Sequence, residues 1–419
     1  MSEIKQGYKQ TKVGIIPEDW EIVKLGKLTT VETGKTPLRS NKQFWDNGTI
    51  NWATTTEVNE TYIVSTNEKI TNQAVAELKM KILPINTILL AMYGQGKTRG
   101  KVALLRIEST INQAFASIKP NKNYSTNFIF NYLDKSYEKI RDLSHGSNQD
   151  NLNLDIVKAL QIPLPPLKEQ EKIAEILTTW DEAITKQEEL LEAKELLKIA
   201  LMQKLLSGEV RFGGFTDEWE EVRLGEIGNS FNGLSGKTGE DFGIGEAKYI
   251  TYKNIFDYSK IKLDIFENVQ ISNDEKQNLV QFGDIFFTVS SETPEEVGMS
   301  SVLLDNVSNT YLNSFCFGYR LNNFNTLDPY FARFYFRSFQ MRDKISRLAQ
   351  GSTRFNLSKN EIMKLKIKLP SLPEQQKIAE VLSLADDEIN LLKNELEELK
   401  QQKKALMQKL LTGQVRVKV

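Results

Sequence analysis

ALMQKLLSGEVRF (residues 200–212) and ALMQKLLTGQVRV (residues 405–417) are two copies of one motif within a single chain of 419 residues. The copies lie 205 positions apart, and the same shift aligns residues 169–212 with 374–417 without a gap, with 22 identities in 44 positions. Such self-similarity indicates a duplicated architecture. The same shift of 205 also aligns residues further upstream, IPLPPLKEQEKIAEIL (162–177) with IKLPSLPEQQKIAEVL (367–382).

The front of each half is also repeated. DWEIVKLGKL (19–28) matches EWEEVRLGEI (218–227), with a shift of 199, but between front and end the two halves show no clear sequence resemblance. The length suggests more than one domain. We therefore predict a first globular domain at 1–167, a first helix at 168–207, a second globular domain at 208–372, and a second helix with a tail at 373–419.

Both repeated segments carry a heptad pattern, in which apolar residues alternate steps of four and three. The prolines before each segment and Gly208 and Gly413 after it are typical of helix ends. At 1.5 Å per residue, some 38 residues give a helix of about 57 Å. Each helix could pack singly or form a homodimer seam, but pairing within the chain is favoured, which makes the two helices antiparallel and the chain an internal pseudo-dimer. The seam positions are Ile173, Leu177, Trp180, Ile184, Gln187, Leu191, Lys194, Lys198, Leu201 and Leu205, then Ile378, Leu382, Ala385, Ile389, Leu392, Leu396, Leu399, Lys403, Leu406 and Leu410.

The charge is unevenly distributed, although the net formal charge is only −1. Residues 1–167 hold 21 Lys and Arg against 16 Asp and Glu, whereas the two helical segments together are acidic. The first domain is thus mildly basic, which permits nucleic-acid binding. The single cysteine, Cys316, excludes an internal disulfide, and the sequence has no long apolar run, so a reducing cytoplasm is expected.

Motifs for catalysis are missing. GKT occurs at 34–36, 96–98 and 236–238, but no glycine stands five residues before any of these, as a phosphate-binding loop requires. His145 is the only histidine, which argues against a His/Cys zinc site and against a Ser-His-Asp triad. We therefore expect a protein that recognises a partner and is not itself an enzyme.

Each globular domain is predicted to mix strands and helices (α/β or α+β). Residues 86–94 and 283–291 are typical of strands that run into polar loops, while residues 127–143 and 328–345 are typical of helices. The loops combine amides, hydroxyls, basic and aromatic residues. Such side chains can contact base edges and phosphates of DNA.

These features resemble the specificity subunits of type I restriction-modification systems over essentially the whole chain. The resemblance rests on the paired 162–177 and 367–382 segments, the two LMQKLL endings, the two W..V.LG openings, and a Gly-Ser pair before each set of prolines. It implies two target recognition domains joined by two antiparallel conserved helices. It further implies a non-catalytic subunit that binds double-stranded DNA, two copies of a methyltransferase subunit and ATP-dependent restriction subunits, with S-adenosylmethionine, ATP and Mg²⁺ held by those partners.

Within that interpretation the duplicated helices hold two methyltransferases equivalently, and each domain reads one half of a gapped DNA site. Two alternatives stay open: a coiled-coil scaffold with two protein-binding domains and no DNA role, and a fused methylase-nuclease. The expected DNA contacts in the first domain are Lys35, Arg39, Gln95, Lys97, Arg99, Asn148 and Gln149. Those in the second are Asn232, Lys237, Tyr252, Lys253, Asn254, Ser291, Thr293 and Arg354. The expected partner contacts are Leu201, Met202, Leu205, Leu206, Leu406, Met407, Leu410 and Leu411.

Overall fold

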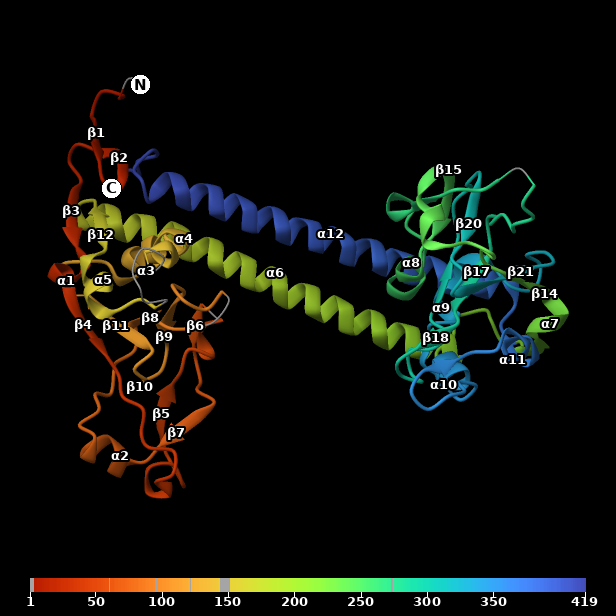
Figure 1. Ribbon diagram of the computed structural model, residues 1–419, viewed down its shortest axis with the longest axis horizontal. Helices are drawn as coiled ribbons and strands as arrows, with labels where there is room; N and C mark the ends of the chain where they lie inside the picture. The colour runs from red at the N-terminus through yellow and green to blue at the C-terminus, as the bar shows by residue number, and fades with distance from the viewer. Residues whose placement is uncertain (1–3, 60, 95–96, 121, 144–150, 273) are drawn as a thin grey trace. The chain divides into compact units, whose positions relative to one another are not determined.

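The computed structural model describes all residues except 1–3, 60, 95–96, 121, 144–150 and 273 (Figure 1). Its contacts divide the chain into two compact units. Unit 1 comprises residues 1–188 and 395–419, and unit 2 comprises residues 189–394. Each unit is therefore a globular domain combined with one part of each long helix. None of the described helices is long and apolar enough to span a membrane.

Unit 1 is built around a five-stranded sheet with the order β4-β11-β8-β9-β6, beside a three-stranded sheet β10-β5-β7 and the pairs β1-β2 and β12-β3. β8 (Ile88–Ala91) and β9 (Val102–Leu105) are buried on both faces, as strands in the middle of a core should be. The remaining strands are β1 (Tyr8–Thr11), β2 (Gly14–Pro17), β3 (Glu21–Lys24), β4 (Thr29–Thr33), β5 (Ile50–Ala53), β6 (Tyr62–Ile63), β7 (Glu68–Ile70), β10 (Thr110–Ile111), β11 (Phe115–Pro120) and β12 (Gln161–Leu164).

The short helices of unit 1 are α1 (Leu25–Leu28), α2 (Asn72–Glu77), α3 (Thr126–Lys135), α4 (Tyr137–Asp142) and α5 (Leu154–Ala159). The helical prediction for 127–143 is confirmed, with a break at Ser136, which ends α3 and begins α4. The side chain of Ser125 accepts a hydrogen bond from the Phe128 amide and so caps the start of α3. The apolar side of α3, including Phe128 and Ile129, joins the core of the unit.

Unit 2 repeats this topology although its sequence differs. Its main sheet has the order β14-β21-β17-β19, its second sheet the order β16-β15-β20, and β13 pairs with β23 as β3 does with β12. In both units the second sheet joins one antiparallel and one parallel neighbour to its central strand. The strands are β13 (Glu220–Arg223), β14 (Gly228–Asn232), β15 (Phe242–Ile250), β16 (Glu267–Val269), β17 (Ile285–Thr288), β18 (Ser290–Ser291), β19 (Ser300–Val302), β20 (Thr310–Leu312), β21 (Cys316–Leu321), β22 (Phe355–Asn356) and β23 (Lys366–Leu369).

The helices of unit 2 are α7 (Leu224–Ile227), α8 (Tyr252–Asp257), α9 (Pro329–Tyr335), α10 (Phe339–Ser346) and α11 (Lys359–Lys364). The predicted helix at 328–345 is thus confirmed as α9 and α10. Phe331 and Phe334 of α9 are buried against the main-sheet residues Phe287 and Tyr319. Cys316 of β21 is also buried, and this burial raises the pKa of its thiol. The mixed α/β class and the internal duplication predicted from the sequence are both confirmed.

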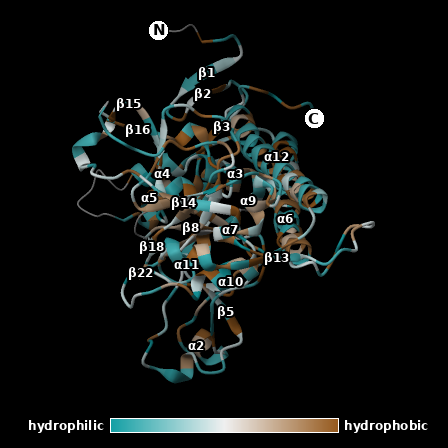
Figure 2. Ribbon diagram, turned by 90° about the vertical axis from the view of Figure 1, so that its right-hand side faces the viewer, coloured by the Kyte–Doolittle hydropathy of each residue, from teal (hydrophilic) through white to brown (hydrophobic). Residues whose placement is uncertain are grey.

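The long helices are α6 (Leu167–Ser207) and α12 (Leu372–Leu410). Both end at the predicted glycines, since Gly208 (φ 76°) and Gly413 (φ 69°) adopt the left-handed conformation that closes a helix. In each copy the backbone N–H two residues after the glycine donates a hydrogen bond back to the last turn of the helix. Val210 donates to the Lys204 carbonyl and Val415 to the Lys409 carbonyl, both at 3.2 Å. In Figure 2 the helix α12 is coloured mainly hydrophilic, with hydrophobic residues recurring along it.

Candidate nucleic-acid interface and helix ends

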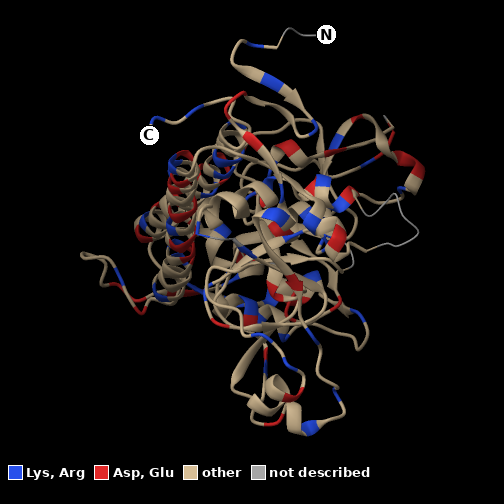
Figure 3. Ribbon diagram, turned by 90° about the vertical axis from the view of Figure 1, so that its left-hand side faces the viewer, with Lys and Arg blue, Asp and Glu red and all other residues tan. Residues whose placement is uncertain are grey.

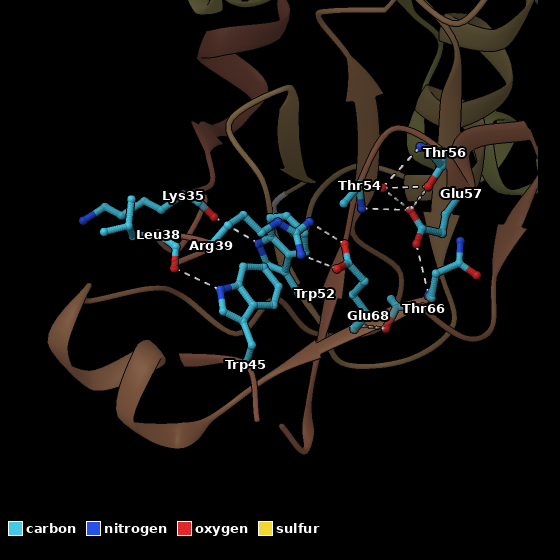
Figure 4. A network of polar contacts seen from close by, with 11 residues as sticks. Lys35, Leu38, Arg39, Trp45, Trp52, Thr54, Thr56, Glu57, Thr66 and Glu68 are labelled. Atoms are coloured by element: carbon cyan, nitrogen blue, oxygen red, sulfur yellow. Dashed lines mark hydrogen bonds and ion pairs between the residues drawn. The ribbon is translucent and has the colours of Figure 1, made fainter. Parts of the chain in front are cut away.

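The loop that follows β4 in unit 1 presents Arg39 on a platform of two tryptophans (Figure 4). The Arg39 guanidinium lies 4.0 Å from the ring centre of Trp45 and 5.2 Å from that of Trp52. It also donates two hydrogen bonds to the carboxylate of Glu68, of which the Nη2 to Oε2 bond measures 2.7 Å. This contact lowers the pKa of the Glu68 carboxyl, so the pair is ionised at neutral pH.

Lys35 stands on the same loop, exposed to solvent, with its Nζ donating to the Leu78 carbonyl at 2.6 Å. It lines a cavity of about 280 Å³ together with Lys79 and Lys81. Lys81 is paired with Glu32 of β4 at 2.5 Å. Glu32 also lines the cavity, so the three lysines leave a smaller but still positive local charge, which suits an anionic group.

The other expected contacts in unit 1 fall on two segments. Lys97 is exposed and its carbonyl accepts a hydrogen bond from the Tyr137 hydroxyl at 2.7 Å, while Arg99, two residues further along, is partly buried. Gln95, Asn148 and Gln149 lie outside the described residues.

Two of the residues predicted to contact DNA in unit 2 are bound inside the fold. Asn254 is fully buried, and its amide bonds to both the carbonyl and the N–H of Lys262, at 2.8 and 3.0 Å. The Lys237 side chain is only 4% exposed and its Nζ lies 2.5 Å from Glu275. In this conformation both side chains hold loops together and neither is available to a nucleic-acid base.

The remaining expected contacts of unit 2 differ in exposure. Tyr252 and Ser291 are largely covered, with hydroxyls that donate to the Ser290 carbonyl at 2.7 Å and to Glu296 at 2.9 Å. Asn232 is exposed and its side-chain oxygen accepts from Lys359 at 2.7 Å. Three further side chains are exposed, those of Lys253, Thr293 and Arg354.

Sequence reasoning missed the residues that organise the Arg39 loop. Trp45 and Trp52 donate their indole N–H groups to the carbonyls of Leu38 and Lys35, at 3.1 and 3.0 Å, and so fix the loop backbone. Glu68 lies in β7, far from Arg39 in the sequence. The residues beside Glu68 gave no sign that it would contact Arg39. The two tryptophans that follow the Gly-Lys-Thr-Pro segment were the signal that could have identified the platform.

The starts of the long helices are anchored by charge pairs that come from the ends of the opposite helices. In unit 1, Arg416 pairs with the nearly buried Glu169 at 2.7 Å and also with Asp19 at 2.8 Å. In unit 2, Arg211 pairs with Glu374 at 2.7 Å, and the Glu374 side chain is 1% exposed. Arg211 and Arg416 are equivalent positions of the repeat, as are Glu169 and Glu374.

The glutamine after each of these glutamates makes an equivalent set of hydrogen bonds. Gln170 donates to the Pro165 carbonyl at 2.8 Å and accepts from the Ser125 amide at 3.0 Å. Gln375 donates to the Pro370 carbonyl and accepts from the Asp328 amide, both at 2.9 Å. Because Ser125 and Asp328 cap α3 and α9, each long helix is tied to the matching helix of its own unit.

The leucines of the repeated motif do not form the free surface that the sequence analysis assigned to partner binding. Leu205 and Leu206 are buried in the core of unit 2, with Leu201 and Met202 packed against it. Met407, Leu410 and Leu411 are buried in the core of unit 1, with Leu406 packed against it. These side chains join each helix end to its own unit, and the partner contact assigned to them stays a prediction.

Polar residues that interrupt the heptad pattern have acidic partners on the other long helix. In unit 1, Gln187 donates to Glu395 at 3.1 Å, and in unit 2 Lys194 pairs with Glu388 at 2.6 Å. Residue numbers fall along α12 as they rise along α6, from the Asp181–Lys403 pair to Glu188–Lys400 in unit 1, so the paired segments are antiparallel. Both charge signs recur along the helices (Figure 3).

Similar proteins were found by sequence and by structure. The MjaIX type I restriction enzyme specificity subunit of Methanocaldococcus jannaschii is 28% identical over 429 residues, covering 98% of this chain and 96% of the relative. A crystal structure of the S subunit of a type I restriction-modification system from M. genitalium covers 93% of this chain and 96% of its own, with a TM-score of 0.55 and 18% identity. A chain from a study of complex assembly and conformational transition in the type I R-M system covers 96% and 99%, with a TM-score of 0.62 and 18% identity.

The family model described as the type I restriction modification DNA specificity domain matches twice, at residues 17–194 and 216–401. The two matches coincide with the duplicated topology of units 1 and 2, each running from the first strands of a globular domain into a long helix. By sequence, by fold and by internal duplication, the chain belongs to the type I restriction-modification specificity family.

Proposed function

We propose that this chain is the DNA-recognition subunit of a type I restriction-modification complex. The observation that carries this is a repeated topology with equivalent helix ends but different surface loops. Equivalent ends suit two copies of one partner, while different loops suit two different DNA half-sites. The likeness to named specificity subunits over nearly the whole chain supports the same assignment.

In this proposal α6 and α12 pair as one antiparallel coiled coil that makes the chain a pseudo-dimer. The ion pairs in each unit and the 39 to 41 residues of each helix support it. Helix length would then set the spacing between the two half-sites, as dimer geometry does for other DNA-binding proteins. Two methyltransferase subunits would dock equivalently, and restriction subunits would join them for cleavage.

The chain itself would contribute no catalytic group and bind no cofactor. The bound methyltransferases would flip the target adenines out of the duplex and supply S-adenosylmethionine, and the restriction subunits would use ATP and Mg²⁺. The bound complex would act on DNA in the cytoplasm. Contacts to phosphate would make its DNA affinity fall as salt rises.

The experiment that tests this function is co-expression of the chain with the methyltransferase subunit of the same restriction-modification system, followed by mapping of N6-methyladenine across a plasmid. A single gapped motif in two parts is expected, and the chain without the methyltransferase should give none. A stable complex that methylates no defined motif would contradict DNA reading and favour a scaffold without a DNA role.

A second prediction concerns Lys79, which has a left-handed backbone (φ 48°) directly after Leu78, the C-cap residue of α2. A glycine would relieve this conformation, and Lys79→Gly is expected to raise the free energy of unfolding by about 0.5–1 kcal/mol, net of the added freedom of the unfolded chain. If Lys79 contacts a phosphate, the same variant should bind DNA more weakly. The slope of log affinity against log salt concentration should then become shallower by about 1.

The matched control is Lys79→Asn, because asparagine tolerates this conformation but has no charge. Its stability should not fall, and its DNA affinity should match that of the glycine variant. Chemical denaturation and binding titrations at several salt concentrations give both quantities. Unchanged affinity in both variants would remove the lysine-lined cavity from the DNA interface.

A further inference from the structure

The orientation of Arg39 leaves one edge of its guanidinium open. Glu68 accepts hydrogen bonds from Nη1 and Nη2, the two end nitrogens, and no described residue accepts a hydrogen bond from Nε. An arginine has five N–H groups in a fixed plane. Its side edge, formed by Nε–H and one Nη–H, therefore remains available, and the Arg39 side chain is 57% exposed.

The platform beneath Arg39 is rigid. The rings of Trp45 and Trp52 meet edge to face at 5.1 Å, and Trp52 is only 2% exposed. Because both indoles also hold the carbonyls of the loop, the backbone and the guanidinium of Arg39 are fixed before any ligand arrives (Figure 4). A side chain held in this way loses little conformational freedom on binding.

Charge indicates what the open edge binds. Glu68 neutralises Arg39 and would itself repel a phosphate, so the pair is poorly suited to the DNA backbone. A base edge with two neighbouring acceptors and no net charge fits better. Two parallel N–H groups match O6 and N7 of guanine in the major groove, and a carboxylate beside them matches the N4 amino group of the paired cytosine.

We propose that Arg39 reads a guanine, with Glu68 as its positioning residue, in the half-site recognised by unit 1. The inference rests on the proposed function and adds to it one base identity. Lys35 and the lysine-lined cavity on the same loop would hold a neighbouring phosphate. The half-site of unit 1 therefore contains at least one G·C pair that depends on Arg39.

The test uses the assembled complex of this chain with its methyltransferase. The methylated motif is first mapped, and each guanine is then replaced in short duplexes by 7-deazaguanine, which lacks N7. One position in one half-site is expected to lose about 10–100-fold in affinity, because the guanidinium keeps its contact with O6 but loses the charge-assisted hydrogen bond to N7. In Arg39→Ala that position should become insensitive to the replacement, and the mapped motif should accept other bases there.

Two variants separate the base contact from other roles. Arg39→Lys keeps the positive charge but cannot make two parallel hydrogen bonds, so a base-reading role predicts no rescue, whereas rescue by lysine would show a phosphate contact and overturn the proposal. Arg106→Ala is the matched control, because Arg106 is also exposed and stacks 4.5 Å from an aromatic ring, that of Tyr62. Its motif should be unchanged.

Failure of the inference and failure of the proposed function give different results. A gapped motif that is unchanged in Arg39→Ala, with no guanine sensitive to N7 removal, overturns the role of Arg39 and leaves the DNA-recognition function standing. The absence of any methylated motif overturns both. Melting temperatures of the variants should match that of the parent chain, since Arg39 lies on the surface.

Discussion

Substitution of Leu206 by alanine is expected to lower the free energy of unfolding of unit 2 by about 3–5 kcal/mol. Leu206 is 1% exposed and packs into the core around Leu224 and Phe331. The loss combines the transfer energy of the removed methyl groups with the cavity that they leave. Denaturant titration combined with amide hydrogen exchange, which resolves unit 2 from unit 1, measures the change.

The control is Leu197→Ala, nine residues earlier on the same helix. Leu197 is 52% exposed, so its replacement should change stability by less than about 0.5 kcal/mol. The equivalent core position in unit 1 is Leu411, which is fully buried, and Leu411→Ala should affect unit 1 as Leu206→Ala affects unit 2. If Leu206→Ala left stability intact and only reduced methyltransferase binding, the motif would contact a partner directly, as its sequence first suggested.

Substitution of Arg211 by alanine is the second change with a large expected effect. The Glu374 carboxylate is buried, and without its cation it remains as an uncompensated charge, which strongly destabilises the folded unit. Thermal and chemical unfolding of the full chain would detect this as a loss confined to unit 2.

Two further variants identify the cause. Adding Glu374→Gln to Arg211→Ala removes the buried charge and should restore much of the lost stability. Arg347→Ala removes an exposed pair with Asp343, four residues earlier on the same helix, and should cost no more than about 0.5 kcal/mol. Equal losses in Arg211→Ala and Arg347→Ala would show that the Arg211–Glu374 pair contributes no more than a surface ion pair.

Much of the architecture could be predicted because helix signals are local. Prolines, heptads and Gly208 and Gly413 fixed the helix bounds closely, and the duplication was visible as a constant shift. The matching sheet orders of the two units were not predictable in this way. Strand pairing depends on contacts distant in sequence, and different core residues such as Leu90 and Phe286 fill equivalent strands.

The site was less accessible to sequence reasoning because exposure and pairing are properties of the fold. An Asn and a Lys in polar loops gave the same signal as Arg39, yet Asn254 and Lys237 are held by their own unit. Glu169 and Glu374 stand among charged helix residues and look solvated, but an arginine more than 160 residues away buries each of them. Apolar helix residues likewise do not reveal which partner covers them.

The composition of unit 1 from residues 1–188 and 395–419 also affects when it can fold during synthesis. Its core includes Leu410 and Leu411, so the ribosome must add more than 200 residues after Glu188 before that core is complete. At about 5–20 residues per second this takes on the order of 10–50 s. The first domain to be made is therefore the last to close, and its apolar helix-binding surface stays exposed to chaperones throughout that interval.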